Sequence, residues 1–310
     1  GPGAAAAVYG AALQSRPSPQ LYEALARPVC QQAADLSPLD CARAAKGFFR
    51  APFAIAERVV LRGPVRDRIL ELGLDAFDAA ALRLLLNALS HAPPAAHGVE
   101  TMACILLEEL HQRLDEFTAE QLACVCRSLS YLRPEVPAVL CAVLDRAQSA
   151  VAAAAMSTAV GVSPETARIT PRHVAMLCRG IIAQPQELLA DGPVRLEALL
   201  PQITAALAEQ PAALVVVQLF GCLVRCPPSE ARSVALAASV RQLLGKAVDL
   251  SAPALVSLSE ALAALSAQQE TTAELKASLV ELFRKVQEQL GIKRYDLRPG
   301  VLQRAVRALG

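Results

Sequence analysis

Apolar residues in this chain recur at a helical spacing, and the pattern repeats about every 40 residues. Counted from a start residue as position 1, positions 6, 9 and 13 are apolar in almost every copy, as in Leu122, Val125 and Leu129. This i, i+3, i+7 spacing places the three side chains on one face of an amphipathic helix. We identify seven start residues, which are Leu36, Phe77, Phe117, Ile169, Pro211, Leu250 and Leu297.

A proline ends this helical face in most copies. It falls at position 17 in four of the seven repeats and one residue later in the third. Proline lacks an N–H and disfavours helical geometry in the residue before it, so it stops the helix. The rest of each repeat predicts a second helix. We therefore predict an all-α protein, specifically an α-solenoid, or superhelix, of about seven two-helix repeats of roughly 40 residues.

The first helix of a repeat, helix A, is expected from about position 2 to about position 16, and helix B follows it. In five copies the start residue precedes a Ser, Thr or Asp, which can accept hydrogen bonds from the free N–H groups of the first turn. These expected caps are Ser37, Asp78, Thr118, Thr170 and Ser251. Helix B is expected within residues 102–114, 136–148, 196–207, 234–244 and 273–290.

We treat residues 21–310 as a single solenoid domain. The repeat starts are 41, 40, 52, 42, 39 and 47 residues apart. The excess in the third repeat falls in the alanine-rich residues 149–167, which we expect to be a helical extension followed by a flexible loop. Residues 1–20 begin with Gly-Pro-Gly, like a protease-cleavage tag scar, and are expected to be disordered. Residues 21–32 are expected to be the last helix of a preceding hairpin that caps the stack, and the last helix A either caps the other end or is followed by more chain.

The composition argues against several functions. The chain is 54 % hydrophobic and 4 % aromatic, but polar residues interrupt its apolar stretches too often for a membrane span. The nine cysteines include no Cys-x-x-Cys, and several fall on core positions, so we expect free thiols in a reducing compartment. Gly-x-Ser-x-Gly, a Gly-rich phosphate loop and His-Glu-x-x-His do not occur. We expect no enzyme activity, no cofactor, no metal and no small-molecule substrate.

Basic residues gather at one position of helix A. Position 11 is basic in four of the seven repeats and lies off the core face, together with positions 4, 8 and 15. Equivalent positions of successive helices line up on one surface of a solenoid. A row of Arg and Lys there can follow a single-stranded phosphate backbone, and a ring such as Tyr131 or His91 can stack on a base. The candidate RNA-binding residues are Lys46, Arg127, Arg179 and Arg307 at position 11, supported by Arg43, Arg50, Arg172, Arg304 and Tyr131.

The same surface permits another interpretation. The net charge is only +1, and basic side chains also serve simply to solvate an exposed helix. Gly221 and Glu260 interrupt the basic residues at position 11. At position 8, Leu84, Cys124 and Met176 are expected to be exposed and favour a groove that accepts partner helices or peptides. The alternative function is an armadillo- or HEAT-like scaffold for protein–protein interaction, without nucleic-acid contact.

The helix A motif can be written apolar-Ser/Thr-x-x-x-Leu-Ala-x-Val/Leu-x-Arg-x-Leu-x-x-x-Pro and is clearest in residues 117–134 and 169–185. It resembles the repeats of organellar RNA-binding proteins, namely the heptatricopeptide and octotricopeptide repeat families and the helical region of FAST-kinase-like proteins. It is more distantly similar to armadillo and HEAT repeats. The resemblance implies RNA processing or membership of a ribonucleoprotein complex in the mitochondrion or another organelle, or otherwise a cytoplasmic role. Its implied partners are single-stranded RNA, protein subunits of a larger complex, or both, and no membrane.

Overall fold

The computed structural model describes residues 2–14, 18–93, 98–132, 137–159, 169–184, 189–268, 273–297 and 299–309. Throughout these ranges the regular structure is helical, without a strand, which confirms the all-α prediction. Contacts divide the chain into an N-terminal unit, residues 1–150 and 163–167, and a C-terminal unit, residues 151–162 and 168–310. The prediction of one domain over residues 21–310 stays a prediction.

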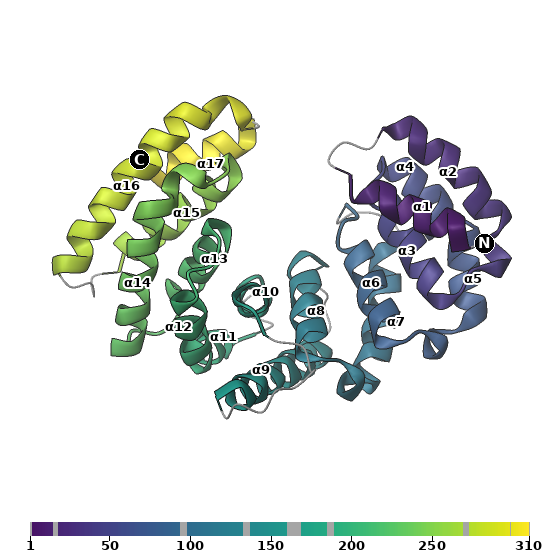
Figure 1. Ribbon diagram of the computed structural model, residues 1–310, viewed down its shortest axis with the longest axis horizontal. Helices are drawn as coiled ribbons and strands as arrows, with labels where there is room; N and C mark the ends of the chain where they lie inside the picture. The colour runs from purple at the N-terminus through teal and green to yellow at the C-terminus, as the bar shows by residue number, and fades with distance from the viewer. Residues whose placement is uncertain are drawn as a thin grey trace. The chain divides into compact units, whose positions relative to one another are not determined.

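Helices of the N-terminal unit form two layers (Figure 1). In the first layer, each helix packs on the next in chain order. This layer consists of α1 (Pro2–Ala12), α3 (Pro38–Phe48), α6 (Ala79–Leu89) and α8 (Ala119–Leu132). The second layer consists of α2 (Pro19–Gln31), α4 (Phe53–Ala56), α5 (Pro64–Leu72) and α7 (Val99–Gln112). Helix α9 (Pro137–Ala159) follows, with its residues up to 150 in this unit and the rest in the C-terminal unit.

The C-terminal unit repeats the same arrangement. Its first layer consists of α10 (Pro171–Ile182), α13 (Ala213–Leu223), α15 (Ala252–Ser266) and α17 (Pro299–Leu309). Its second layer consists of α11 (Gly192–Ala198), α12 (Leu200–Ala208), α14 (Glu230–Lys246) and α16 (Ala273–Lys293). Within the second layer, α12 packs on α14 and α14 on α16. The predicted helices A and B therefore correspond to the first and second layers of each unit.

The hydrophobic periodicity and the predicted caps account for the helices of the first layer. Leu122, Val125 and Leu129, at positions 6, 9 and 13, are fully buried. Four of the five predicted caps bond to the backbone of their helix, since the side chains of Ser37, Asp78 and Thr118 accept from N–H groups at 3.2, 2.7 and 3.2 Å. Thr170 forms a capping box with His173. Ser251 precedes α15 as predicted but makes no side-chain cap hydrogen bond.

A short 3₁₀ turn precedes five of the seven start residues, which the periodicity did not predict. The five turns are η1 (Ala33–Asp35), η3 (Leu74–Ala76), η4 (Leu114–Glu116), η5 (Ala247–Asp249) and η6 (Arg294–Asp296). In three cases the residue just before the turn is basic and donates to backbone carbonyls at the junction with the preceding repeat. Arg113 reaches Leu74 O at 3.4 Å, Lys246 reaches Pro211 O at 2.6 Å, and Lys293 reaches Val248 O and Leu250 O at 2.7 Å.

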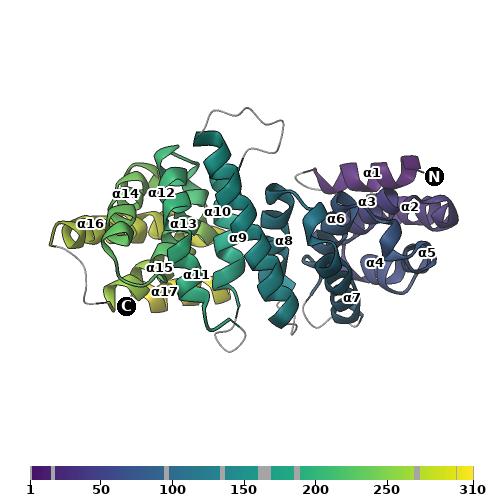
Figure 2. The same cartoon turned by 90° about the horizontal axis from the view of Figure 1, so that it is seen from below.

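The beginning of the chain differs from the expectation of disorder. Pro2–Ala12 form α1, which packs on α3, with Ala5, Val8 and Ala11 buried. Gly47 of α3 permits this approach, because a Cβ there would lie 2.8 Å from the backbone carbonyl of Val8 (Figure 2). Helix α2 packs on α1 as the second helix of a hairpin, and α1 supplies the first helix of that hairpin.

Alanine-rich residues in the third repeat continue a helix, as expected for a helical extension. Helix α9 runs through Ala159. The flexible loop predicted after the extension falls on residues 160–167, outside the described residues.

Candidate nucleic-acid interface

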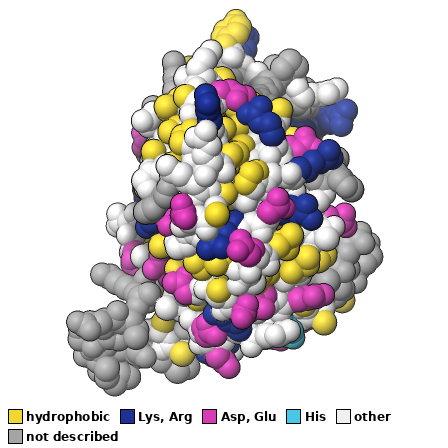
Figure 3. All heavy atoms as spheres, turned by 90° about the vertical axis from the view of Figure 1, so that its right-hand side faces the viewer, with side chains coloured by type: hydrophobic (Ala, Val, Ile, Leu, Met, Phe, Trp, Pro, Cys, Tyr) yellow, Lys and Arg dark blue, Asp and Glu magenta, His cyan; other side chains and the backbone are white. Residues whose placement is uncertain are grey.

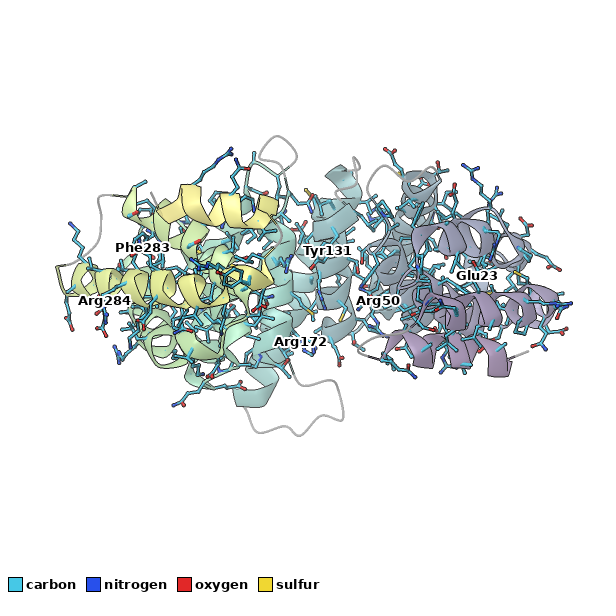
Figure 4. All side chains as sticks on the ribbon, turned by 90° about the horizontal axis from the view of Figure 1, so that it is seen from above. Glu23, Arg50, Tyr131, Arg172, Phe283 and Arg284 are labelled. Carbon is cyan, nitrogen blue, oxygen red and sulfur yellow. The ribbon has the colours of Figure 1, made fainter. Side chains whose placement is uncertain are left out.

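The nine predicted RNA-binding residues lie on or beside first-layer helices of both units. In the N-terminal unit, Arg43 and Lys46 lie on α3, Arg50 follows α3, and Arg127 and Tyr131 lie on α8. The C-terminal unit carries Arg172 and Arg179 on α10, and Arg304 and Arg307 on α17. Figure 4 shows Arg50 and Tyr131 in the N-terminal unit and Arg172 in the C-terminal unit.

Hydrogen bonds connect the position 11 side chains of α3 and α6 in the N-terminal unit and continue to α8. The Lys46 ammonium on α3 hydrogen-bonds Asn87 Oδ1 on α6. Asn87 Nδ2 in turn donates to Ser128 Oγ on α8 at 3.3 Å. The predicted alignment of position 11 across the layer is therefore present along α3 and α6, and it continues to the residue beside Arg127 on α8.

His91 completes the surroundings of the Lys46 ammonium. Lys46 Nζ lies 3.4 Å from Nδ1 and 3.3 Å from Nε2 of the His91 ring. His91 Nδ1 lies 2.8 Å from the carbonyl oxygen of Asn87. Because that carbonyl only accepts, Nδ1 carries the proton and Nε2 is the acceptor that faces the ammonium. The histidine is thus held as a neutral ring beside a cation.

The charges around Lys46 are all positive. Burial, and after it the charges of Arg50, Arg127 and Arg83, lower the pKa of Lys46 to about 7. Burial likewise lowers the pKa of His91 to about 4, with Lys46 as the next cause. We call Lys46, Arg50, Arg83 and Arg127 the basic cluster. Across the described parts of the chain, no carboxylate lies within ion-pair distance of its three arginines.

Sequence reasoning missed Arg83, because it lies at position 7 and not at positions 4, 8, 11 or 15. Its helical spacing could have identified it, because Arg83 precedes Asn87 by four residues and therefore lies on the same face of α6. The Arg83 Nε atom is buried and has no hydrogen-bond partner. A buried guanidinium nitrogen without an acceptor adds to the excess of donors in the basic cluster.

Two of the supporting residues differ in their surroundings. The Arg43 guanidinium lies 3.7 Å from the carboxylate of Asp40, so part of its charge is compensated. Tyr131 lies four residues after Arg127 on α8 and is 42 % exposed, so its ring lies on the same side of the helix and is accessible.

In the C-terminal unit the position 11 row is interrupted. Gly221 of α13 supplies no side chain, and Glu260 of α15 pairs with Arg304 of α17 at 3.3 Å. Arg172 and Arg307 are exposed, and Arg179 is half-buried. An acidic residue within the row and a gap beside it leave this unit with less uncompensated positive charge than the basic cluster provides.

The position 8 residues are less accessible than expected. Met176 is 7 % exposed, so the prediction of an exposed side chain there is wrong. Leu84 and Cys124 are half-buried. Because the helices of the first layer pack on both neighbours, position 8 forms part of the contact between them, and the expected apolar groove is not found at this position.

The described residues contain little other reactive chemistry. They hold no group of three or more His, Cys, Asp or Glu side chains arranged to bind a metal ion. All nine cysteines are free thiols. Burial raises the pKa of Cys41 and of Cys126 to about 12, so neither thiol is a nucleophile at neutral pH.

Comparison with known proteins leaves the family open. No protein-family model matches the sequence, and a search of curated proteins finds no match. Among the helices that the structure describes, none combines the length and the apolarity needed to cross a membrane.

Proposed function

We propose that this protein is a non-enzymatic α-solenoid of about seven two-helix repeats that binds single-stranded RNA through the first-layer face of its N-terminal unit. Two observations support the solenoid. Helices pack in chain order within the first layer of each unit and within the second layer of the C-terminal unit, and a basic residue links successive repeats through backbone carbonyls in three places.

The basic cluster carries the RNA proposal. Three arginines repel the half-buried ammonium of Lys46, and burial together with this repulsion lowers the pKa of Lys46 to about 7. Such repulsion costs stability, so a protein that retains it has a use for uncompensated positive charge. A phosphate oxygen beside Lys46 and Arg127 would supply the missing negative charge and release condensed counterions from the RNA.

Stacking groups accompany the cluster. Tyr131 lies one helical turn beyond Arg127 with an exposed ring, and His91 is a neutral ring at pH 7 because its pKa is about 4. Base stacking on such rings tolerates any sequence. This combination of cations and rings suits single-stranded RNA better than a duplex, whose bases are stacked on one another.

The cellular setting follows from the resemblance of the repeats. We propose a role in RNA processing or within a ribonucleoprotein complex in the mitochondrial matrix or another organelle. Nine free cysteines suit a reducing compartment. The competing function, a protein scaffold without nucleic-acid contact, is favoured by the Glu260–Arg304 pair and by the near-zero net charge.

Binding of a labelled single-stranded RNA pool to the 310-residue chain separates the two functions. We expect micromolar or tighter affinity at low salt. Replacing Arg127 or Arg50 by Glu should weaken binding at least tenfold, because each reversal removes an attraction to phosphate and adds a repulsion. Arg284→Glu, at an exposed residue of α16, changes the net charge equally and should have little effect. Absence of binding at low salt, or equal losses in all three variants, would refute the proposed interface.

A further inference from the structure

A groove opens between α5 and α7 in the second layer of the N-terminal unit. Its described residues surround a cavity of about 770 Å³. Ile69 and Leu106 form a buried floor, whereas the side chains of Leu70 and Ile105 are 56 % and 47 % exposed. Two large apolar side chains exposed beside one groove indicate a surface that is covered by a partner.

An interruption in the preceding helix accompanies the groove. After α4 the chain forms a π-helical turn, η2 (Glu57–Leu61), and α5 begins only after Gly63. A Cβ on Gly63 would lie 2.9 Å from the carbonyl of Val59, so the bend depends on glycine. Helices α5 and α7 both contact η3, and the groove lies between them. In the C-terminal unit, by contrast, α12, α14 and α16 pack directly on one another.

The length of the groove suits a helix. Its lining extends from Gly98 to Gln112 along α7, which at 1.5 Å per residue is about 20 Å. Its lining combines buried apolar side chains with the solvent-exposed charged side chains of Arg62, Arg66 and Glu108. A small-molecule site would instead bring a few polar groups together inside the cavity. A groove of this form accepts the apolar face of an amphipathic helix.

Charges of opposite sign border the two sides of the groove. Arg62 and Arg66 lie on the α5 side, and Glu108 and Glu109 on the α7 side. Arg62 pairs with Glu57 and Glu109 with Arg113, each at 3.1 Å. Arg66 and Glu108, both exposed, have no ion-pair partner in the described ranges.

These observations specify the occupant. We propose that the groove binds an amphipathic helix of a protein partner, with its apolar face on Leu70 and Ile105. The flank of that helix toward α5 carries acidic residues that meet Arg66, and the flank toward α7 carries basic residues that meet Glu108. Figure 3 shows the α5 side of the unit, where hydrophobic side chains reach the surface between basic and acidic ones. This surface is separate from the basic cluster, so the proposal does not depend on RNA binding.

Selection from a displayed library of 14-residue helical peptides, with the whole chain as target, tests the proposal. We expect enriched peptides with apolar residues at i, i+3 or i+4, and i+7, acidic residues on one flank and basic residues on the other. Their synthetic versions should bind with micromolar affinity. Leu70→Asp and Ile105→Asp should each weaken binding at least tenfold, whereas Val280→Asp, at a 71 % exposed residue of α16, should not.

Charge exchange then tests the orientation. The double variant Arg66→Glu with Glu108→Lys should bind peptides with exchanged acidic and basic flanks at least tenfold more tightly than the original peptides. The proposal is overturned if no patterned peptide is enriched or if the enriched peptides tolerate both Asp substitutions. It is also overturned if Leu70→Asp abolishes a self-association detected by sedimentation, because the occupant is then a second copy of this chain. Loss of RNA affinity in Leu70→Asp would also overturn the proposal, because the groove would then belong to the nucleic-acid surface.

Discussion

Lys46 is the residue of the proposed interface whose charged form destabilises the folded protein most. Its ammonium is half-buried, hydrogen-bonds Asn87 and faces His91, yet its charged neighbours are three arginines. Asn87 and the His91 ring supply neutral acceptors, which satisfy donors of the ammonium without neutralising its charge. The charged form of Lys46 is therefore destabilised in the free protein, and a bound anion would stabilise it.

Replacing Lys46 by Met is expected to stabilise the protein at low pH while weakening RNA binding. The pKa of Lys46 is about 7 in the folded protein, against its ordinary value of 10.5. Below pH 7 the folded protein carries the full cost of the charged form, and this cost declines as pH rises from 7 toward 10.5. Because solvent screens a half-buried group, we expect a gain of about 1 kcal/mol at pH 6 and a smaller gain at pH 9. Thermal denaturation at both pH values measures this, and a loss of stability at pH 6 would mean that the Lys46 hydrogen bonds are structural.

RNA affinity is expected to fall as pH rises above 7. Phosphate prefers the charged form of Lys46, so binding above pH 7 requires uptake of a proton, and affinity should fall by up to about tenfold per pH unit. His91 does not contribute, because its pKa of about 4 keeps it neutral in this range, and Arg50, Arg83 and Arg127 remain charged. Fluorescence anisotropy at constant ionic strength measures the effect. Lys46→Arg is the control, since arginine does not titrate and its profile should be flat.

Individual helices were predictable where one local rule determines them. The apolar residues at positions 6, 9 and 13 and the caps Ser37, Asp78 and Thr118 mark the first-layer helices in the local sequence. Helix α1 was missed because an alanine-rich segment has little amphipathic pattern, and its position depends on Gly47 of another helix. The basic cluster was predicted in part, since position 11 identified Lys46 and Arg127. Arg83 joins it only through the packing of α6 between α3 and α8.

Hydrogen bonds from basic side chains join the helices of successive repeats, and substitution of Lys293 tests how much they stabilise the protein. Its ammonium donates to the carbonyls of Val248 and Leu250 at 2.7 Å, and a charged donor to a carbonyl contributes about 1.5–3 kcal/mol. We expect Lys293→Met to lower the free energy of unfolding by about 2 kcal/mol, measured by chemical denaturation. Lys276→Met, at an exposed lysine of the same helix, should change it by less than about 0.5 kcal/mol. Equal effects of the two substitutions would show that these links do not stabilise the stack.

At the scale of the whole molecule, the net charge of +1 does not show that some basic side chains are paired and others are not. Many basic side chains are already engaged, either with carboxylates, as in Arg304 with Glu260, or with backbone carbonyls, as in Lys246 and Lys293. In the basic cluster, by contrast, several cationic side chains lie together without a compensating carboxylate among the described residues. Composition could not distinguish these groups, since the distinction depends on which side chains the fold brings together.

The salt dependence of RNA binding should reveal which basic side chains are available to contact phosphate. For a single strand, log K falls with log salt at a slope of about −0.7 for each phosphate neutralised, so a cluster of four cations predicts a slope of about −3. Arg127→Gln should reduce the slope by about 0.7, because one phosphate contact is lost. Arg304→Gln should leave it almost unchanged, since Glu260 already compensates Arg304 in the C-terminal unit. A slope near −6 that both substitutions reduce equally would place RNA along both units, as the original row of position 11 residues predicts. A slope near zero would exclude phosphate contacts altogether, and the uncompensated charge of the basic cluster would then require an acidic protein partner.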